Sequence, residues 1–338
     1  MKRTLLITDY SIYYIIVVLM FCMTSQFING QNKQDTLLLK KAQDINKKFP
    51  FAHMVDFQYT YFTPSKVKTR INGKDFSDTK VNFQQLLTTS VNLPLYMSSK
   101  FMVINSFKYQ YATVKMQDPD VSVSQDIRKY LNKTDSTNTY TEALNLVYID
   151  KLFNKRIIFN LSTFADFSSH GYERINGSLT LSYELKHTDR TSFSIGMLGT
   201  TDPSASTPVI PIISFSHWFN EKYLFDCLAP AYLYFRRIYT NKSRLSLGAN
   251  LYSYESFSHP VIPAATSFTY QRNKVELAAI YEKNLCSGLN LSSKIGYVMN
   301  MREKVSITNT NNTSLFLSQK PNFSFSIGVT YDLIPKKH

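Results

Sequence analysis

Glycine, proline and tryptophan are scarce in this sequence of 338 residues. It contains 10 glycines, 12 prolines and one tryptophan, against 23 tyrosines and 24 phenylalanines. Serine, threonine and asparagine crowd the segments between the aromatic residues. Aromatic and small polar residues favour strands and turns over helices. This composition does not fit a soluble two-domain enzyme and points to an all-β chain.

Long apolar runs are also missing after residue 25. The hydrophobic fraction is 43%, yet the mean hydropathy is −0.20 because polar residues alternate with the apolar ones. A membrane-spanning helix needs about 20 consecutive apolar residues. We therefore expect no helical span beyond the first residues.

Cysteine is rare, and acidic residues are fewer than basic ones. The three cysteines have no metal-ligand spacing, so we expect neither a metal nor a cofactor. The 38 Lys and Arg residues outnumber the 24 Asp and Glu residues, for a net charge of +14. They are dispersed rather than gathered in a stripe, which argues against nucleic-acid binding. A positive surface suits an exported protein beside anionic lipopolysaccharide.

The two ends of the chain differ from the rest. Lys2 and Arg3 precede an apolar run over residues 12–23, as in a secretory signal peptide. We expect residues 1–30 to be such a signal, with an N-terminal membrane anchor as the alternative. Residues 31–50 are expected to form a periplasmic lead-in or a short amphipathic helix, and residues 335–338 a C-terminal tail.

From residue 51 to 334 the hydrophobic period is two. In residues 323–333 apolar side chains alternate strictly with small or polar ones. Many alternating stretches run ten residues or more, longer than is usual in a soluble sandwich and long enough to cross a membrane when tilted. We predict a transmembrane antiparallel β-barrel of about fourteen strands, within a range of 12 to 16.

The segmentation also predicts individual strands and loops. It treats 222–238 as one strand and 262–272 and 274–284 as two. The longest connections fall at 64–78, 115–138 and 302–320 and would all face outward if the first strand runs outward.

The leader ending at Gly30 and Gln31, the tyrosine-rich strands and the closing strand at 323–333 resemble uncharacterised outer-membrane β-barrel families, domains of unknown function, of Gram-negative bacteria, particularly of the Bacteroidota. The resemblance covers nearly the whole mature chain but contains no diagnostic short motif. It implies location in the cell outer membrane, with the barrel-insertion machinery, outer-membrane lipid and lipopolysaccharide as partners. One departure is the tail beyond Tyr331, because such barrels typically end on an aromatic residue.

Strand phase places a set of charged residues on the inner face, because Lys or Arg on the lipid face at mid-depth costs about 2 to 4 kcal/mol. They would either line a water-filled pore or pair with one another and fill the interior, and the second reading is favoured. The expected lumen residues are Arg156, Asp166, Glu184, Lys186, Asp226, Arg236, Lys274, Glu276 and Lys294.

One cluster suggests chemistry. Ser168, Ser169, His170, Asn176 and Ser178 surround a single turn, and a serine activated by a histidine is the core of a hydrolase. Serine and asparagine are so common here that chance explains the cluster, so we expect no enzyme. The leading expectation is a porin-like channel or transporter for an unknown small solute, or a structural envelope component. The alternatives are a lipid-modifying outer-membrane enzyme and a secreted β-sandwich adhesin.

Overall fold

The computed structural model describes most of the chain after the lead-in. The described residues are 49–50, 53–71, 74–117, 134–202, 205, 207–240, 242–258, 268–286, 288–307 and 313–332. By its internal contacts the chain divides into two units, Met1–Leu37 and Leu38–His338, and every described residue belongs to the second. The expected signal at 1–30, nearly all of the lead-in and the tail at 335–338 lie outside the described residues.

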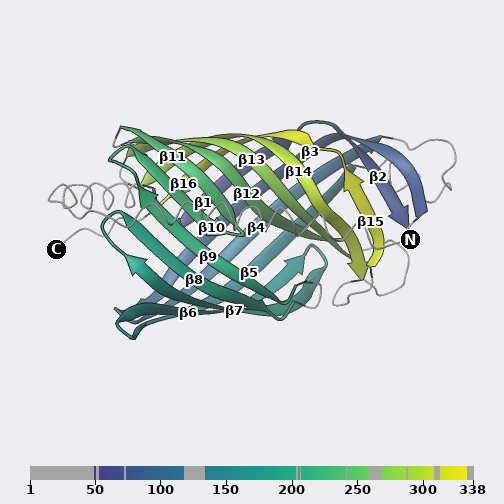
Figure 1. Ribbon diagram of the computed structural model, residues 1–338. Coiled ribbons are helices and arrows are strands. Elements are labelled where there is room, and N and C mark those ends of the chain that lie inside the picture. Colours follow the sequence, from purple (N-terminus) through teal and green to yellow (C-terminus); the bar gives the residue numbers. More distant parts are fainter. Residues whose placement is uncertain are drawn as a thin grey trace, which may run out of the picture. The chain divides into compact units, whose positions relative to one another are not determined.

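The described residues form strands joined by turns and loops (Figure 1). Among them no helix is long and apolar enough to cross a membrane. The strand segments are β1 (Val55–Phe62), β2 (Ser65–Ile71), β3 (Lys74–Met97), β4 (Phe101–Gln117), β5 (Thr134–Leu152), β6 (Lys155–Ser168), β7 (Gly171–His187), β8 (Thr191–Thr200), β9 (Val209–Trp218), β10 (Tyr223–Ala229), β11 (Tyr232–Thr240), β12 (Ser243–Ser258), β13 (Phe268–Cys286), β14 (Leu289–Ile307), β15 (Thr313–Gln319) and β16 (Asn322–Tyr331).

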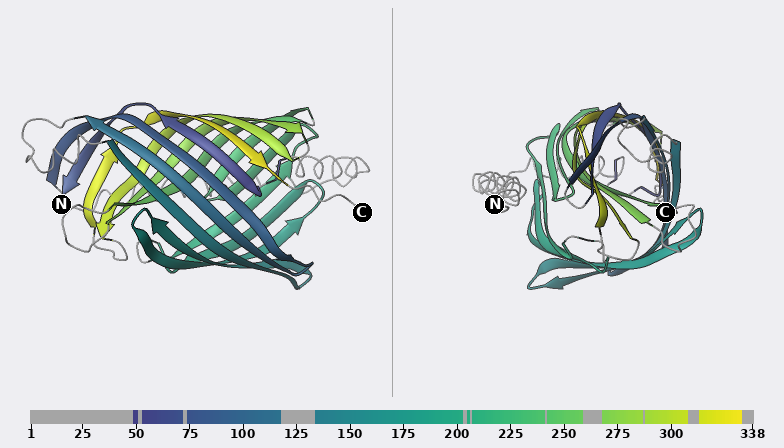
Figure 2. Two further views of the ribbon diagram at one scale, coloured as in Figure 1. Left: turned by 180° about the vertical axis from the view of Figure 1, so that it is seen from behind. Right: turned by 90° about the vertical axis from the view of Figure 1, so that its right-hand side faces the viewer.

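These segments close into an antiparallel barrel of fourteen strands, as predicted. Segments β1 and β2 both pair with β3, and β15 and β16 both pair with β14. Each couple is therefore one barrel strand with a break in it. Closure follows because β1 pairs with β16 and β2 with β15. The strands encircle a common axis (Figure 2, right).

The two breaks lie opposite each other at the closing seam, and each contains a proline. Pro64 separates β1 from β2, and Pro321 separates β15 from β16. Proline has no amide hydrogen and cannot donate to the ladder. The flanking backbone bonds cross the seam, from Thr63 N to Phe323 O at 2.9 Å and from Lys320 N to Lys66 O at 2.8 Å. Closure thus survives both prolines.

The connections divide the barrel into a short-turn end and a long-loop end. At the short-turn end, where β1 begins and β16 ends, the connections span two to four residues. They are 98–100, 153–154, 188–190, 219–222, 241–242 and 287–288. The strand ends joined by the longest connections, 118–133, 259–267 and 201–208, lie at the opposite end. The predicted loop at 115–138 corresponds to the first of these, whereas the predicted loops at 64–78 and 302–320 are mostly strand.

Two strand predictions were wrong and offset each other in the count. Residues 222–238 form two strands, β10 and β11, because the chain turns at Pro230 and Ala231 without a polar signal. The predicted turn at Asn273 instead lies inside β13, which pairs with β12 without a break. The register with β14 shifts at this point because β14 carries one extra residue, Met301. Asparagine is a common turn residue, so the sequence alone suggested a turn.

The outer and inner faces differ as the period-two pattern predicted. Along β16 exposed and buried residues alternate without exception. Phe325 and Ile327 on the outer face are 45% and 53% exposed, whereas Ser324 on the inner face of the same strand is fully buried. An apolar outside and a polar inside reverse the arrangement of a soluble barrel.

Candidate functional site: a closed polar lumen

Strand β13 carries three charged side chains that face the lumen in succession. Arg272, Lys274 and Glu276 alternate with outward residues, and their exposed fractions are 2%, 1% and 0%. Charges so deeply buried require partners, because removal from water costs several kcal/mol per ion. The neighbours of each therefore determine what the lumen does.

Glu276 is fully partnered by the strands beside it. Lys294 Nζ on β14 donates to Glu276 Oε2 at 2.7 Å, and the Ser324 hydroxyl on β16 donates to the other carboxylate oxygen. Gly296 makes room for this group, because a Cβ there would lie 2.4 Å from Glu276 Oε1. The ion pair joins β13 to β14, and the serine hydrogen bond joins β13 to β16, both on the inner face.

Arg272 faces the carboxylate of Glu303 on β14. Arg272 Nε lies 3.7 Å from Glu303 Oε1, and Tyr270 OH donates to Glu303 Oε2 at 3.1 Å. The guanidinium also donates to the Tyr270 hydroxyl and lies 4.6 Å from that ring's centroid. Its NH1 atom is buried without a hydrogen-bond partner among the described residues.

A second ionic network lies nearer the long-loop end and crosses the lumen. Arg174 Nε on β7 donates to Asp166 Oδ2 at 2.9 Å, and Arg174 NH1 lies 3.4 Å from Asp202 Oδ2. Its remaining nitrogen pairs with Glu255 on β12, a strand that is not a neighbour of β7 in the sheet. Phe257, also on β12, lies under the guanidinium at 5.4 Å.

Another contact between opposite walls joins β5 to β12. The hydroxyls of Thr137 and Tyr254 are 3.1 Å apart, and the two strands touch although they are not hydrogen-bonded neighbours. Together with the Arg174 network, this contact brings β12 against β5 and β7. The lumen is therefore interrupted between its middle and its long-loop end.

The lumen is also filled at the short-turn end. Phe49, which precedes the first strand, is 3% exposed and packs with Trp218, Leu224 and Ile238 from β9, β10 and β11. Its ring lies 4.7 Å below the Arg244 guanidinium. The end of the lead-in thus enters the barrel and covers the inner wall there.

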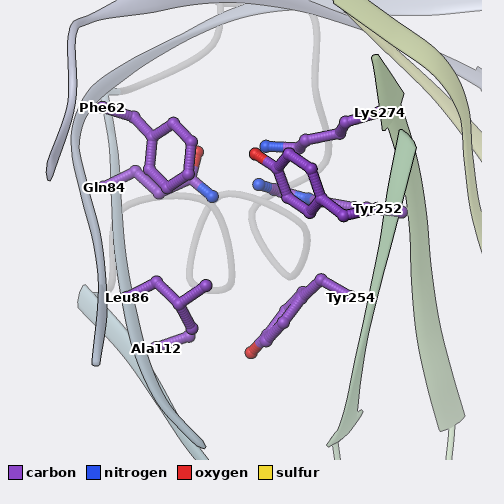
Figure 3. Close-up of a pocket in the computed structure, with 8 residues that line it drawn as sticks. Phe62, Gln84, Leu86, Ala112, Tyr252, Tyr254 and Lys274 are labelled. Atoms are coloured by element: carbon purple, nitrogen blue, oxygen red, sulfur yellow. The ribbon is translucent and has the colours of Figure 1, made fainter. Parts of the chain in front are cut away.

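A small cavity lies between these closures. It is lined on one side by residues of β1, β3 and β4 and on the other by residues of β12 and β13 (Figure 3). Its free volume of about 10 Å³ is roughly that needed by one water molecule. The lining residues are Phe62, Gln84, Leu86, Ala112, Tyr252, Tyr254, Arg272 and Lys274.

The structure places the expected lumen residues in different surroundings. Glu276 and Lys294 form an ion pair, Lys274 lines the central cavity, and Asp166 belongs to the Arg174 network. A further pair forms between Arg236 Nε and Asp226 Oδ2 at 3.1 Å, with Ser246 accepting from Arg236 NH1 at 3.0 Å.

The remaining three expected residues lie near the short-turn end. Glu184 Oε1 is 3.0 Å from His187 Nδ1, and Arg156 is exposed. Lys186 departs from the expectation. A bulge after Glu184 puts it in register with Phe193, whose ring contacts Phe215 on the outer face. One inserted residue reverses the side on which every later residue lies.

Sequence reasoning missed Arg174, Glu255, Arg272 and Glu303. Glu303 was assigned to a loop, and Arg272 ended a predicted strand. The period-two alternation continues through Arg272 and through Glu303. A charged residue on the polar side of such a run is the signal that could have identified them.

The serine and histidine cluster lies at the β6–β7 turn of the long-loop end. Ser169 Oγ is 3.3 Å from His170 Nδ1, while the Ser168 hydroxyl donates to Glu173 Oε1 at 2.5 Å. The Glu173 carboxylate at this turn thus accepts from Ser168, and the expectation that the cluster is not catalytic stays a prediction. Among the described residues, no three His, Cys, Asp or Glu side chains lie together as metal ligands would.

No protein-family model matches the sequence, and no curated protein is similar to it. Among solved structures, an outer membrane channel from Pseudomonas putida F1 is 11% identical with a TM-score of 0.39, over 83% of this chain and 96% of that one. The Pseudomonas putida toluene transporter TodX is 9% identical with a TM-score of 0.38, over 84% and 90%. The transport unit of the autotransporter AIDA-I from Escherichia coli is 9% identical with a TM-score of 0.31, over 90% and 100%. Likeness at this level supports no argument about what the chain does.

Proposed function

We propose that this chain is an outer-membrane β-barrel that passes small polar solutes through a lumen that is closed at rest. The apolar outer face supports the membrane location. Leu161, Leu247 and Ile295, on three different strands, are 48%, 50% and 58% exposed. A soluble protein rarely exposes so much contiguous apolar surface. Assignment to the Bacteroidota-type families, and partnership with lipopolysaccharide and the insertion machinery, belong to the same proposal.

The observation that carries the transport role is the kind of contact that closes the lumen. Thr137 with Tyr254, and Arg174 with Glu255, join strands that share no backbone hydrogen bonds. Such side-chain contacts can separate without opening the barrel wall. A neutral hydrogen bond such as Thr137–Tyr254 contributes only about 1 kcal/mol, and one between charged groups such as Arg174–Glu255 about 1.5 to 3 kcal/mol. An open state is therefore within reach of a bound solute and of rare thermal opening.

Planar-bilayer recording of the purified full chain tests this function. We expect rare, brief openings in the unaltered protein and longer ones when β12 is released from β5 and β7. Silence in both the unaltered and the released protein contradicts transport. Heat-dependent mobility on a denaturing gel tests the barrel separately, and extraction by alkaline carbonate would contradict membrane insertion.

A further inference from the structure

The central cavity has an unusual balance of charge. Of its lining residues only Arg272 and Lys274 are charged, and both are cationic. Two carboxylates lie near them. Glu276 is held by Lys294 and Ser324, whereas Glu303 accepts from Tyr270 and also lies 3.7 Å from Arg272 Nε. Three cations, Arg272, Lys274 and Lys294, therefore share two carboxylates. The cavity therefore has a positive lining with no carboxylate of its own.

Lys274 is the residue that stands out. It is 1% exposed, and its amino group lies 4.5 Å from the centroid of the Phe62 ring. Within the described part of the chain its amino group makes no hydrogen bond and no ion pair, and the Phe62 ring is its contact. Figure 3 shows it reaching across the lumen toward Phe62 and the Gln84 amide. A cation held over an aromatic ring gains some attraction, but less than it loses by leaving water.

Arg272 adds a second unsatisfied donor to the same cavity. Its NH1 atom is buried without a hydrogen-bond partner among the described residues, and so is the carbonyl oxygen of the Gln84 side chain. Rotation of that amide would turn a third donor toward the cavity, since the two ends of an amide occupy equivalent positions. Buried donors without acceptors are expensive, and an anion would satisfy them together.

We infer that Lys274 and Arg272 form a binding site for one small monovalent anion, a halide ion. The size follows from the cavity, which has room for about one water molecule. The sign follows from its lining. The inference rests on the proposed transport function only in giving the site a purpose: an anion held midway would make the lumen favour anionic solutes.

Thermal unfolding of the purified full chain in detergent tests binding without any need for conduction. At equal ionic strength, sodium bromide is compared with sodium acetate and sodium gluconate, whose anions are too large for the cavity. We expect bromide to raise the unfolding temperature of the unaltered protein above its value in acetate or gluconate. An equal rise in acetate would contradict a halide site.

Two variants show whether Lys274 is the cause. Lys274→Met keeps an unbranched side chain of similar length and removes the charge. The apparent affinity of this variant for bromide should therefore fall at least tenfold. In gluconate this variant should unfold at a higher temperature than the unaltered protein, because an uncompensated buried cation is gone. Lys283→Gln, on the same strand but exposed, removes the same charge and should respond as the unaltered protein does.

Anomalous diffraction from crystals grown in bromide gives a direct reading. A peak between Lys274 and Arg272 is expected in the unaltered protein and not in Lys274→Met. An unaltered protein without anion dependence, or an equal dependence in Lys274→Met, overturns the site. Conductance without anion binding would leave the transport function standing and remove this inference alone.

Discussion

The phenol of Tyr254 meets the hydroxyl of Thr137 at 3.1 Å across the lumen. The two residues belong to β12 and β5, which lie on opposite walls of the barrel and share no ladder. This contact narrows the lumen and is held by a single hydrogen bond. It can therefore act as a closure that opens without unfolding of the barrel.

Tyr254→Phe tests this closure by removing only the hydroxyl. Loss of a hydrogen bond that contributes about 1 kcal/mol should raise the ratio of open to closed time about fivefold. Single-channel recording measures that ratio. Tyr281→Phe is the matched control, because Tyr281 faces outward and is 42% exposed. Equal dwell times in Tyr254→Phe and the unaltered protein would rule out this contact as a gate.

Phe49→Ala tests whether the end of the lead-in covers the short-turn end of the lumen. Trp218 is the one tryptophan of the sequence and packs with Phe49. Loss of a buried phenylalanine ring costs about 3 kcal/mol or more, so the segment should undock. Acrylamide should then quench the Trp218 fluorescence more strongly.

Phe153→Ala provides the comparison for Phe49→Ala, because Phe153 lies in a turn at the same end and is 85% exposed. Its quenching should match the unaltered protein. Unchanged quenching in Phe49→Ala would show that Phe49 does not shield the lumen.

Asp332→Ala should weaken the closing seam. The Asp332 carboxylate meets His53 Nδ1 at 2.8 Å and accepts from Met54 N at 3.0 Å, so it ties the start of the barrel to its end. We expect the free energy of unfolding to fall by about 1 to 3 kcal/mol, as measured by denaturant titration in detergent. Asp150→Ala removes a carboxylate that is more exposed at the short-turn end and should cost less. An equal loss in both variants would argue against a seam clasp.

Ile327→Arg tests the depth of the outer face in the membrane. Ile327 is 53% exposed on β16, while Tyr331 lies at the short-turn end of the same strand. Arginine costs about 2 to 4 kcal/mol near the bilayer midplane and about 0 to 1 near its edge. Refolding into lipid vesicles should therefore suffer more from Ile327→Arg than from Tyr331→Arg. Equal penalties would show that this face does not span a bilayer.

Much of the wall could be predicted from the sequence, because alternation is a local property. Phe323, Phe325 and Ile327 reveal their face by their spacing alone, and a strand that alternates this strictly has one buried side. Strand ends were harder. The turn at Pro230 carries no polar residue, and Asn273 is a typical turn residue although it lies inside β13, so the two errors offset each other in the predicted count of strands.

The lumen could be predicted only as a set of inward charges. Lys186 was assigned inward by phase, and the bulge after Glu184 reverses it. Glu255 belongs to the Arg174 network, which no pattern along one strand could indicate. Which charge pairs with which depends on strands brought together by closure of the barrel.

The amino-acid sequence by itself determined that this chain is a closed antiparallel barrel with an apolar outer face, because period-two alternation along each strand specifies which side chains share a face. Only the tertiary structure decided that Tyr254 meets Thr137, that Phe49 enters the barrel, and that Lys274 is left with an aromatic ring as its neighbour. These relationships join residues that lie far apart along the chain, and such contacts form only when all the strands close around one axis.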